Sequence, residues 1–417
     1  MNENENLVPK RRFKEFTNTG TWEQRKLGDV SPLRGGYAFQ SEKFRSQGVP
    51  IIRISNILSD GNIGGNYAFY DEQEADDKYS LPDGAALLAM SGATTGKVAI
   101  LSNPDNTKFY QNQRVGYFSD LKIVNYDFVS TIVKSNLFIS QLSSVLAAGA
   151  QPNVSSKEID SFGFYFPKTL KEQTKLGIFF KQLDETIALH QRELDNLKIT
   201  KQVFMKKMFP KEGEKVPEVR FPGFMADWDY RKLGDVGETY TGLSGKSKDD
   251  FGHGRGKYVT YMNVFSNSIA NPSLVELVEI DTKQNEVNPG DIFFTTSSET
   301  PEEVGMSSVW LENSDNTYLN SFCFGYRPIE KFDNYYLAYM LRSSVVRKKI
   351  TFLAQGISRY NISKNKVMDI AVPIPVIEEQ TKIGEFFKQL DDIINLQQQE
   401  LEKLKQTKQA FLQKMFI

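Results

Sequence analysis

The chain has 417 residues, 40% hydrophobic and 25% charged, values typical of soluble globular proteins with two or three domains. The formal net charge of -1 gives no support for a nucleic-acid partner, so any basic binding face must be a local patch. One cysteine and two histidines exclude a disulfide framework and a His/Cys metal cage. No apolar run approaches the roughly 18 residues of a membrane span, and the polar N-terminal residues lack the apolar core of a signal peptide. We therefore expect a cytoplasmic protein.

A short N-terminal tail, residues 1–17, precedes a predicted globular domain at residues 18–168. This domain combines β-rich runs at 49–54 and 85–90 with a helical stretch near 126–147. Turn residues separate these elements, and no regular βαβ alternation is present. The composition of elements therefore predicts a mixed α/β (α+β) domain.

Residues 169–210 are predicted to form one long helix. Apolar residues follow a 3.5-residue repeat through five heptads, which is typical of a coiled-coil seam. Thr169 to Glu172 resembles a capping box at its start, and Pro210 is expected to end it. The predicted seam consists of Leu176, Phe180, Leu183, Ile187, His190, Leu194, Leu197, Lys201, Phe204 and Met208.

A linker rich in proline, glycine and charge, residues 211–219, leads to a second predicted globule at 220–375. Its elements are β-rich runs at 258–262 and 291–296 and a helical stretch at 334–353. A second heptad helix at 376–417 follows. Its segment 379–416 is identical to segment 172–209 at 25 of 38 positions. Its seam repeats the first as Ile383, Phe387, Leu390, Ile394, Gln397, Leu401, Leu404, Lys408, Phe411 and Met415.

The globules are also duplicated, although more weakly. The run Trp22…Arg25-Lys26-Leu27-Gly28-Asp29-Val30 returns as Trp228…Arg231-Lys232-Leu233-Gly234-Asp235-Val236, and Asn153-Val154-Ser155 returns as Asn361-Ile362-Ser363. Such a repeat indicates two copies of one structural unit. Because the helices are nearly the same and the globules match only at framework positions, we expect the helices to meet equivalent partners and the globules to meet different ones.

The apolar stripe of each helix needs a mate, and the obvious mate is the other copy. We expect antiparallel pairing, which would place the globules at opposite ends as a spacer, with parallel pairing as the alternative. Polar residues recur in both seams at matching places and are typical of positions that fix register. Further aromatic residues, Phe179/Phe386 and Phe209/Phe416, either contact the base of the globules or dock another protein.

No catalytic constellation is present in either half. The run Gly92-Ala93-Thr94-Thr95-Gly96-Lys97-Val98 looks like a phosphate loop, but it has three residues between its glycines, and Val98 replaces the Ser/Thr that would bind magnesium. Two histidines, neither repeated in the other copy, leave no plausible Ser/His/Asp arrangement. We therefore expect a chain that is not itself an enzyme.

As a set, these features resemble the specificity (S) subunit of type I restriction-modification enzymes over essentially the whole chain. They are two variable globules, each followed by a near-identical helix that opens with Glu-Gln-Thr-Lys and ends near Lys-Met-Phe, and each preceded by a Trp…Lys-Leu-Gly-Asp-Val start. The resemblance extends to the segments that precede the two helices, Phe164-Tyr165-Phe166-Pro167 and Ala371-Val372-Pro373-Ile374-Pro375.

The resemblance implies two target-recognition domains, each reading one half of a bipartite asymmetric DNA site. The two long helices would set the unread spacer and would be the platform on which two methyltransferase subunits dock. With the pairing expected above, they would join the domains as an antiparallel coiled coil with an internal pseudo-two-fold duplication. The implied partners are double-stranded DNA, two modification (methyltransferase) subunits and restriction (translocase/nuclease) subunits, with no membrane. This chain would hold no cofactor, since S-adenosylmethionine, ATP and Mg would belong to the partner subunits. The alternative function is a tandem coiled-coil adaptor for protein or glycan ligands.

The family tends to carry the loop after the globule's long helix near DNA, which points to Gln151, Asn153, Arg359 and Asn361. Amide and guanidinium groups form paired hydrogen bonds to base edges. Asn153 and Asn361 recur between copies, so an alternative is that they cap the loop. Cations in two clusters are candidates for phosphate contacts, with a solvated surface charge as the alternative for each. The DNA-binding candidates are completed by Arg53, Lys97, Lys246, Lys248, Arg255, Lys257, Arg347 and Lys348, and Arg342 and Lys349 lie in the second cluster.

Overall fold

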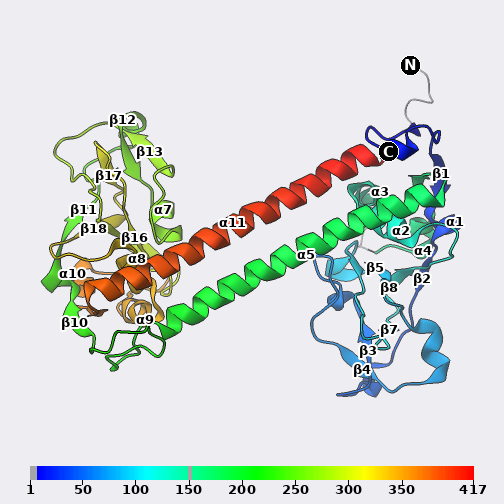
Figure 1. The fold of residues 1–417 in the computed structure, drawn as a ribbon, viewed down its shortest axis with the longest axis horizontal. Coiled ribbons are helices and arrows are strands. Elements are labelled where there is room, and N and C mark those ends of the chain that lie inside the picture. The colour runs from blue at the N-terminus through cyan, green and yellow to red at the C-terminus, as the bar shows by residue number, and fades with distance from the viewer. Residues whose placement is uncertain (1–6, 149–152) are drawn as a thin grey trace. The chain divides into compact units, whose positions relative to one another are not determined.

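The computed structural model describes residues 7–148 and 153–417, which form two compact units (Figure 1). The first unit contains the residues up to His190 together with Glu400–Ile417, and the second contains Gln191–Gln399. The two long helices, α5 (Leu170–Lys207) and α11 (Ile377–Met415), each contribute one stretch to either unit. Each unit is therefore built from one globule and two helix segments that are distant in sequence. The domain boundaries expected from the sequence stay a prediction.

The first unit is centred on a four-stranded antiparallel sheet, in the order β2 (Leu33–Gly35), β8 (Val115–Phe118), β5 (Ala86–Ala89) and β6 (Val98–Ile100). A second sheet has the order β4 (Ala68–Tyr70), β3 (Val49–Ile52) and β7 (Tyr110–Gln111), and β3 pairs with β7 in parallel. A third pairing joins β1 (Glu23–Lys26) to β9 (Gly163–Phe166). The helices are α1 (Leu27–Val30), α2 (Tyr126–Val133), α3 (Asn136–Ala148) and α4 (Ser156–Asp160), with 3₁₀ turns η2 (Lys14–Phe16), η3 (Ser41–Lys43), η4 (Ile54–Asn56), η5 (Glu74–Tyr79) and η6 (Gly92–Thr94).

The second unit repeats this topology. Its four-stranded sheet has the order β11 (Gly237–Thr241), β18 (Cys323–Pro328), β14 (Ile292–Thr295) and β16 (Ser307–Val309). Its three-stranded sheet has the order β13 (Val275–Val278), β12 (Phe251–Val259) and β17 (Thr317–Leu319), again with one parallel pairing. Two further pairs are β10 (Asp229–Lys232) with β20 (Ala371–Ile374) and β15 (Ser297–Ser298) with β19 (Tyr360–Asn361). The helices are α6 (Leu233–Val236), α7 (Tyr261–Ser266), α8 (Asn334–Arg342), α9 (Ser344–Phe352), α10 (Lys364–Met368) and the turn η7 (Lys248–Asp250). The duplication and the mixed α/β class expected from the sequence are confirmed.

One expectation about an individual element was wrong. The β-rich run at 258–262 is interrupted, because the Thr260 side chain accepts a hydrogen bond from the Asn263 amide and starts α7 there. The helical stretches expected near 126–147 and 334–353 are confirmed, and each consists of two helices. The break falls at Ser135 and at Ser343, both buried, and Ser343 has an extended backbone (φ -63°, ψ 152°) that no helix interior allows.

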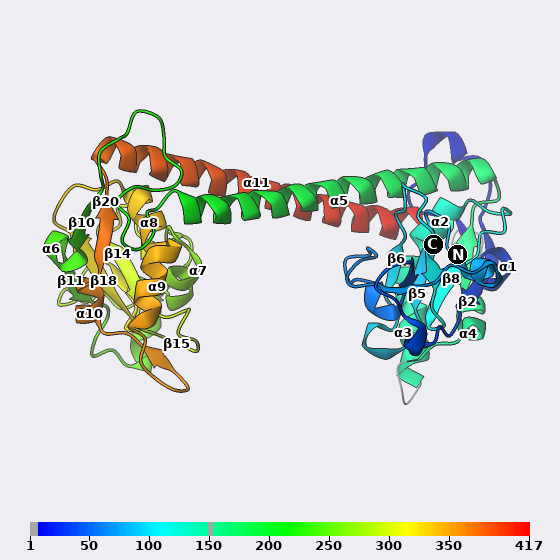
Figure 2. The same ribbon diagram turned by 90° about the horizontal axis from the view of Figure 1, so that it is seen from below.

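The long helices run antiparallel in each unit. In the first unit, Phe179 near the start of α5 meets Phe411 near the end of α11, with ring centroids 5.2 Å apart. In the second, Phe204 near the end of α5 meets Phe386 near the start of α11 at 5.1 Å. Figure 2 shows the same side-by-side course of α5 and α11 within each unit. The antiparallel coiled coil expected from the heptads is confirmed.

The residues of the predicted seam are all buried or half-buried. Ten of the twenty are buried and the other ten are half-buried, so none is exposed. The two seam lysines point at carboxylates of the opposite helix: Lys201 Nζ lies 2.5 Å from Asp391, and Lys408 pairs with Asp184. Cross-helix pairs at matching places favour one register, because a shifted register would leave these charges half-buried and unpaired.

The aromatic residues at the helix ends complete the core of each globule. In the first unit, Phe416 stacks on Phe128 with centroids 5.3 Å apart and meets the edge of Trp22 at 6.1 Å. In the second, Phe209 takes the same place against Trp228, at 6.4 Å. Of the two interpretations of these aromatics, contact with the globules is therefore the one observed for Phe209 and Phe416.

The start of each copy is anchored on the start of its long helix. Arg12 donates two hydrogen bonds to the carboxylate of Glu172, at 2.6 and 2.7 Å, and both side chains are almost fully buried. Arg220 and Glu379 form the same pair at 2.6 and 2.8 Å. The capping box expected at Thr169 is therefore only half formed: its hydroxyl accepts from the Glu172 amide, whereas the carboxylate turns to Arg12.

Candidate nucleic-acid interface

Three segments of the first unit meet just beyond the end of β5. The Met90 amide donates to the Arg114 carbonyl at 3.0 Å, and the Val154 amide donates to the Met90 carbonyl at 3.0 Å. Ser91 and Asn153 form an isolated bridge beside them. This ladder places the loop before β8 and the stretch after α3 on the two sides of one short extended segment.

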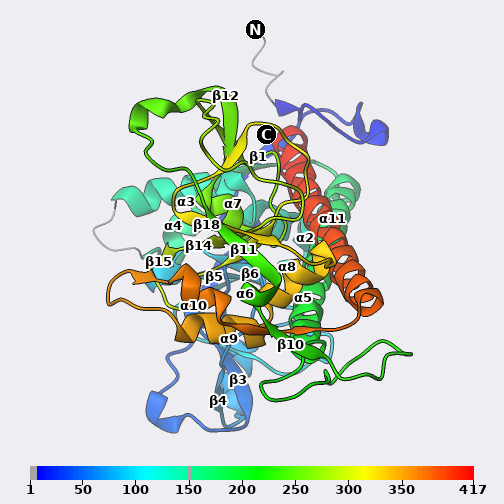
Figure 3. The same ribbon diagram turned by 90° about the vertical axis from the view of Figure 1, so that its left-hand side faces the viewer.

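The second unit builds the same ladder beyond β14. The Thr296 amide donates to the Phe322 carbonyl at 3.0 Å, and the Ile362 amide donates to the Thr296 carbonyl at 3.0 Å. Strands β15 and β19 extend the ladder. In Figures 2 and 3, the loop between α9 and β19 (orange) projects from the side of this unit that lies away from α11. Each unit thus presents one backbone frame in the same way.

Cations gather on the frame of the first unit. Arg53 precedes η4, and the Thr94 hydroxyl ties η6 to η4 by donating to the Ile54 carbonyl at 3.2 Å. Within the described residues, Arg53, Lys97 and Arg114 form no ion pair with a carboxylate, and the buried Arg53 Nε has no hydrogen-bond partner. Between residues 84 and 119 the sequence holds one acidic residue, Asp105. This surface is therefore locally positive on a nearly neutral protein.

The frame of the second unit carries different chemistry. Phe322 is 56% exposed. The exposed Arg359 donates to the Ser297 hydroxyl at 3.1 Å, and the main chain of Asn361 exchanges two hydrogen bonds of 2.9 Å with Gln355. Arg359 and Asn361 are thus brought together at the frame, with their side chains on the surface.

Four of the predicted phosphate-binding cations have internal partners instead: Lys246, Arg342, Arg347 and Lys349. Lys246 pairs with Asp281 at 3.0 Å, and this hydrogen bond raises the pKa of the lysine. Arg347 donates to the carbonyls of Gly305, Glu302 and Val304 at 2.6 to 2.7 Å, and burial lowers the pKa of its guanidinium to about 10. Arg347 holds the loop that follows β15 in place. Arg342 and Lys349 also donate to main-chain carbonyls.

The remaining predicted residues lie at several places. Lys248, Arg255 and Lys257 are exposed on η7 and β12, which Figure 3 shows at a different place on the unit from β15. Lys348 is exposed and lies 3.6 Å from Glu212. Asn153 is exposed beside Ser91, whereas Gln151 lies outside the described residues.

Two residues of the frame, Arg114 and Phe322, were missed by sequence reasoning. They hold equivalent positions, two residues after Asn112 and Asn320, whose amides donate to the carbonyls of Ile52 and Val259. The asparagine that both copies share is the signal in the sequence that marks this position. The strands around it are short in both copies, so the pattern of hydrophobic residues there is weak.

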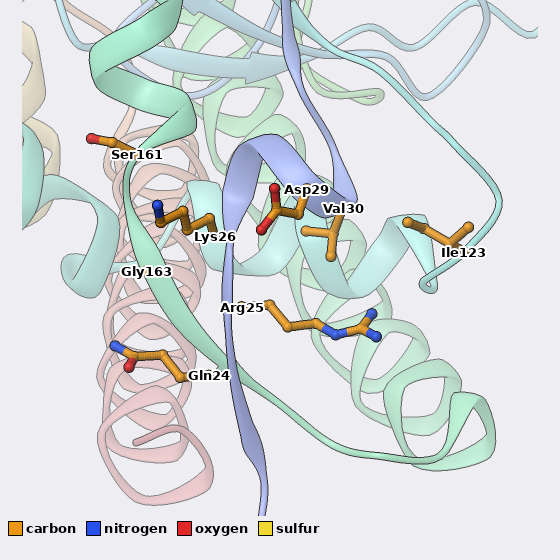
Figure 4. Close-up of a pocket in the computed structure, with 8 residues that line it drawn as sticks. All are labelled: Gln24, Arg25, Lys26, Asp29, Val30, Ile123, Ser161 and Gly163. Carbon is orange, nitrogen blue, oxygen red and sulfur yellow. The ribbon is translucent and has the colours of Figure 1, made fainter.

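A surface hollow lies apart from this frame, at β1, α1 and β9 of the first unit (Figure 4). Its charged residues Arg25, Lys26 and Asp29 belong to the run repeated in the second unit. The hollow is lined by Gln24, Arg25, Lys26, Asp29, Val30, Ile123, Ser161 and Gly163.

Among the residues that the structure describes, no three His, Cys, Asp or Glu side chains come together so as to hold a metal ion. Within the same residues, no helix combines the length and apolarity that crossing a lipid bilayer would require.

Comparison with known proteins identifies the family. A family model described as the type I restriction modification DNA specificity domain matches residues 19–198 and again residues 225–406. The putative type I restriction enzyme MjaX specificity subunit of Methanocaldococcus jannaschii is 24% identical over 430 residues, covering 94% of this chain and 92% of that protein. The MjaVIII specificity subunit of the same organism is 24% identical over 347 residues, covering 76% of this chain and 73% of that protein.

Among solved structures, the S subunit of a type I restriction-modification system from M. genitalium matches with a TM-score of 0.63 and 15% identity over 99% of both chains, which shows a shared fold. The family model covers both repeats and most of the chain. The chain therefore belongs to the type I restriction-modification DNA specificity family, whose members are the non-catalytic subunits that recognise DNA sequence.

Proposed function

We propose that each unit reads one half of a split, asymmetric DNA site, and that α5 and α11 set the length of unread DNA between the halves. The observation that carries the proposal is the pair of equal backbone ladders with different side chains. Because the two backbone frames are the same, both units are expected to approach DNA in the same way. Because the side chains on the frames differ, the two units are expected to recognise different bases. Because recognition depends on such groups rather than on net charge, a chain of near-neutral charge suits this function.

The charges of the first frame support contact with DNA. Cations that form internal ion pairs contribute little to binding, as with Lys108, which Glu72 and Asp77 neutralise. Arg53, Lys97 and Arg114 keep their charge available to phosphates and base edges. We assign phosphate contacts to Lys248, Arg255 and Lys257 in the second unit, since these side chains are exposed.

We further propose that two methyltransferase subunits dock, one on each unit, and that restriction subunits join this assembly in the cytoplasm. Those subunits would carry S-adenosylmethionine, ATP and Mg, whereas this chain would hold no cofactor. Exposed or partly exposed residues that are equal in both copies support a partner present twice. They include Arg25/Arg231, Asp29/Asp235, and Leu189/Leu396, which are 52% and 58% exposed on the two long helices.

The test is a hybrid in which residues 220–375 are replaced by the second globule of another specificity subunit. The expected methylome of cells expressing the hybrid with its methyltransferase subunit has one new half-site, the old first half-site and an unchanged spacer. The reason is that the first frame and both long helices are kept. A change in both half-sites would contradict separate reading, and a changed spacer would contradict the role given to the helices.

A further inference from the structure

The ladder fixes one outward-facing position in each unit, occupied by Arg114 in the first and Phe322 in the second. Each carbonyl accepts the amide proton of the segment beyond the central strand, at 3.0 Å. Phe322 is held further, since its amide donates to Asn320 Oδ1 at 2.9 Å and its carbonyl accepts from the Thr296 hydroxyl at 2.9 Å. The residue that follows is buried in both copies, Val115 and Cys323. The backbone is therefore set by the fold, and only the outward side chain is free to vary.

The side chains of Arg114 and Phe322 are both exposed, but they differ in charge and polarity. Arg114 is exposed and pairs with no carboxylate among the described residues. Phe322 exposes 56% of its surface, although it stands on a rigid part of the frame. A phenylalanine whose main chain is fixed by three hydrogen bonds and whose surface is still 56% exposed gains little burial from the fold itself. Its position makes sense if burial comes from a ligand.

We propose that this position reads one base pair in each half-site, with Arg114 binding a guanine and Phe322 contacting the methyl group of a thymine. The inference rests on the proposed function and names the bases read at one point of each frame. An arginine can donate two hydrogen bonds to O6 and N7 of guanine in the major groove, and apolar side chains contact the thymine methyl group.

Phosphate binding is a poorer assignment for this position. A phenyl ring cannot bind a phosphate, so a position that holds Phe322 on an equivalent frame is not built to face the DNA backbone. Because the two frames are the same, Arg114 is expected to point into the DNA groove as Phe322 does. The neighbouring cations Arg53 and Lys97 are available for phosphates on the first frame.

The experiment maps methylated adenines in DNA modified by the full chain assembled with its methyltransferase subunit. Arg114→Gln should relax one guanine of the first half-site, with adenine accepted there, because glutamine pairs with adenine. Loss of a paired contact weakens discrimination by about 1–3 kcal/mol, or roughly 5- to 150-fold. Phe322→Ala should relax one thymine position of the second half-site. In each variant the other half-site stays unchanged.

Matched controls separate this role from others. Lys108→Gln removes a cation of the same unit that Glu72 and Asp77 already neutralise, and Ile280→Ala removes an apolar side chain that is 41% exposed in the second unit. Neither should alter the site. Arg114→Lys keeps the charge and can still donate to O6 and N7 of guanine, so it should keep the guanine preference. If Arg114→Gln fails to assemble, Arg114→Ala takes its place and should relax the same guanine.

The outcomes distinguish the inference from the proposed function. A glutamine variant that methylates the original site more weakly, with the guanine still required, would make Arg114 a phosphate contact and overturn the inference. Unchanged half-sites in the Arg114→Gln and Phe322→Ala variants would overturn it as well. A wild-type complex that methylates no split site would instead overturn the proposed function.

Discussion

Surface residues at equivalent positions of the two units are of two kinds: those that differ between the copies, and those that are the same, whether fully or partly exposed. Arg25 and Arg231 stay equal although their acid partners differ: Arg25 pairs with Glu23 at 2.9 Å, and Arg231 pairs with Glu330 at 2.7 Å. All four side chains are about 40% exposed, and such pairs contribute about 0–1 kcal/mol to stability. Internal pairing therefore does not explain why both copies keep an arginine.

A partner that meets both copies explains it, and charge reversal tests this. Arg25→Glu should weaken the binding of one of the two methyltransferase subunits by about tenfold or more. The reason is that a negative charge would then face the group of the partner that binds the arginine. Native mass spectrometry of the complex should then show one bound subunit at concentrations where the wild type holds two. Arg231→Glu should have the same effect, and the double variant should hold none.

Arg45→Glu is the matched control, since Arg45 forms a somewhat more exposed pair with Asp71 and has no arginine counterpart in the second unit. It should keep two subunits. Full occupancy in the double variant would show that the repeated arginines do not contact the partner.

At the scale of elements, the sequence predicts what is periodic or local. The heptads show both long helices and their seam, and Pro210 lies just beyond the end of α5 at Lys207. Partners distant in sequence are not visible in such a pattern. Asp391, which pairs with Lys201, stands outside the seam rows on the other helix. Arg347 and Lys246 look like surface cations in the sequence, yet the fold surrounds them with carbonyls and a carboxylate.

The helices also allow a sharp test of their length. Seven residues inserted after Leu197 and seven before Ile394 would keep the seam in register in both helices. They would add about 10 Å of rise. If the helices set the spacer, the unread DNA should lengthen by about three base pairs, at 3.4 Å per base pair. Methylome mapping measures the new spacer.

Four residues inserted after Leu197 alone serve as the control. They would rotate the rest of α5 by about 40° and break the seam, so the complex should lose activity rather than change its site. A paired heptad insertion that methylates the original site with the original spacer would rule out the helices as the measure of distance.

At the scale of the whole molecule, the duplication predicts that half the chain can complete itself. In residues 1–212 the core of the first unit lacks Leu412, Met415 and Phe416, all buried in the full chain. A second copy of the half-chain can supply the equivalent Met205, Met208 and Phe209. We expect a two-fold dimer, and two-fold proteins read inverted repeats. With methyltransferase subunits it should methylate a palindrome of the first half-site, and sedimentation should show the dimer.

Residues 1–203, which lack all three replacing side chains, should remain monomeric and inactive. A half-chain of 1–212 that is monomeric at high micromolar concentration and directs no methylation would show that the two helix ends are not interchangeable.

The joint beneath each tryptophan has a consequence for the order of the chain. Beneath Trp228, Phe209 and Lys215 belong to one continuous stretch, whereas beneath Trp22 the corresponding Phe416 and Leu7 come from opposite extremes of the sequence. The main chain makes the same contact at both joints, through the Leu7 and Lys215 carbonyls. The same packing therefore forms whether its parts are adjacent in the sequence or far apart, so it does not depend on which globule comes first along the chain.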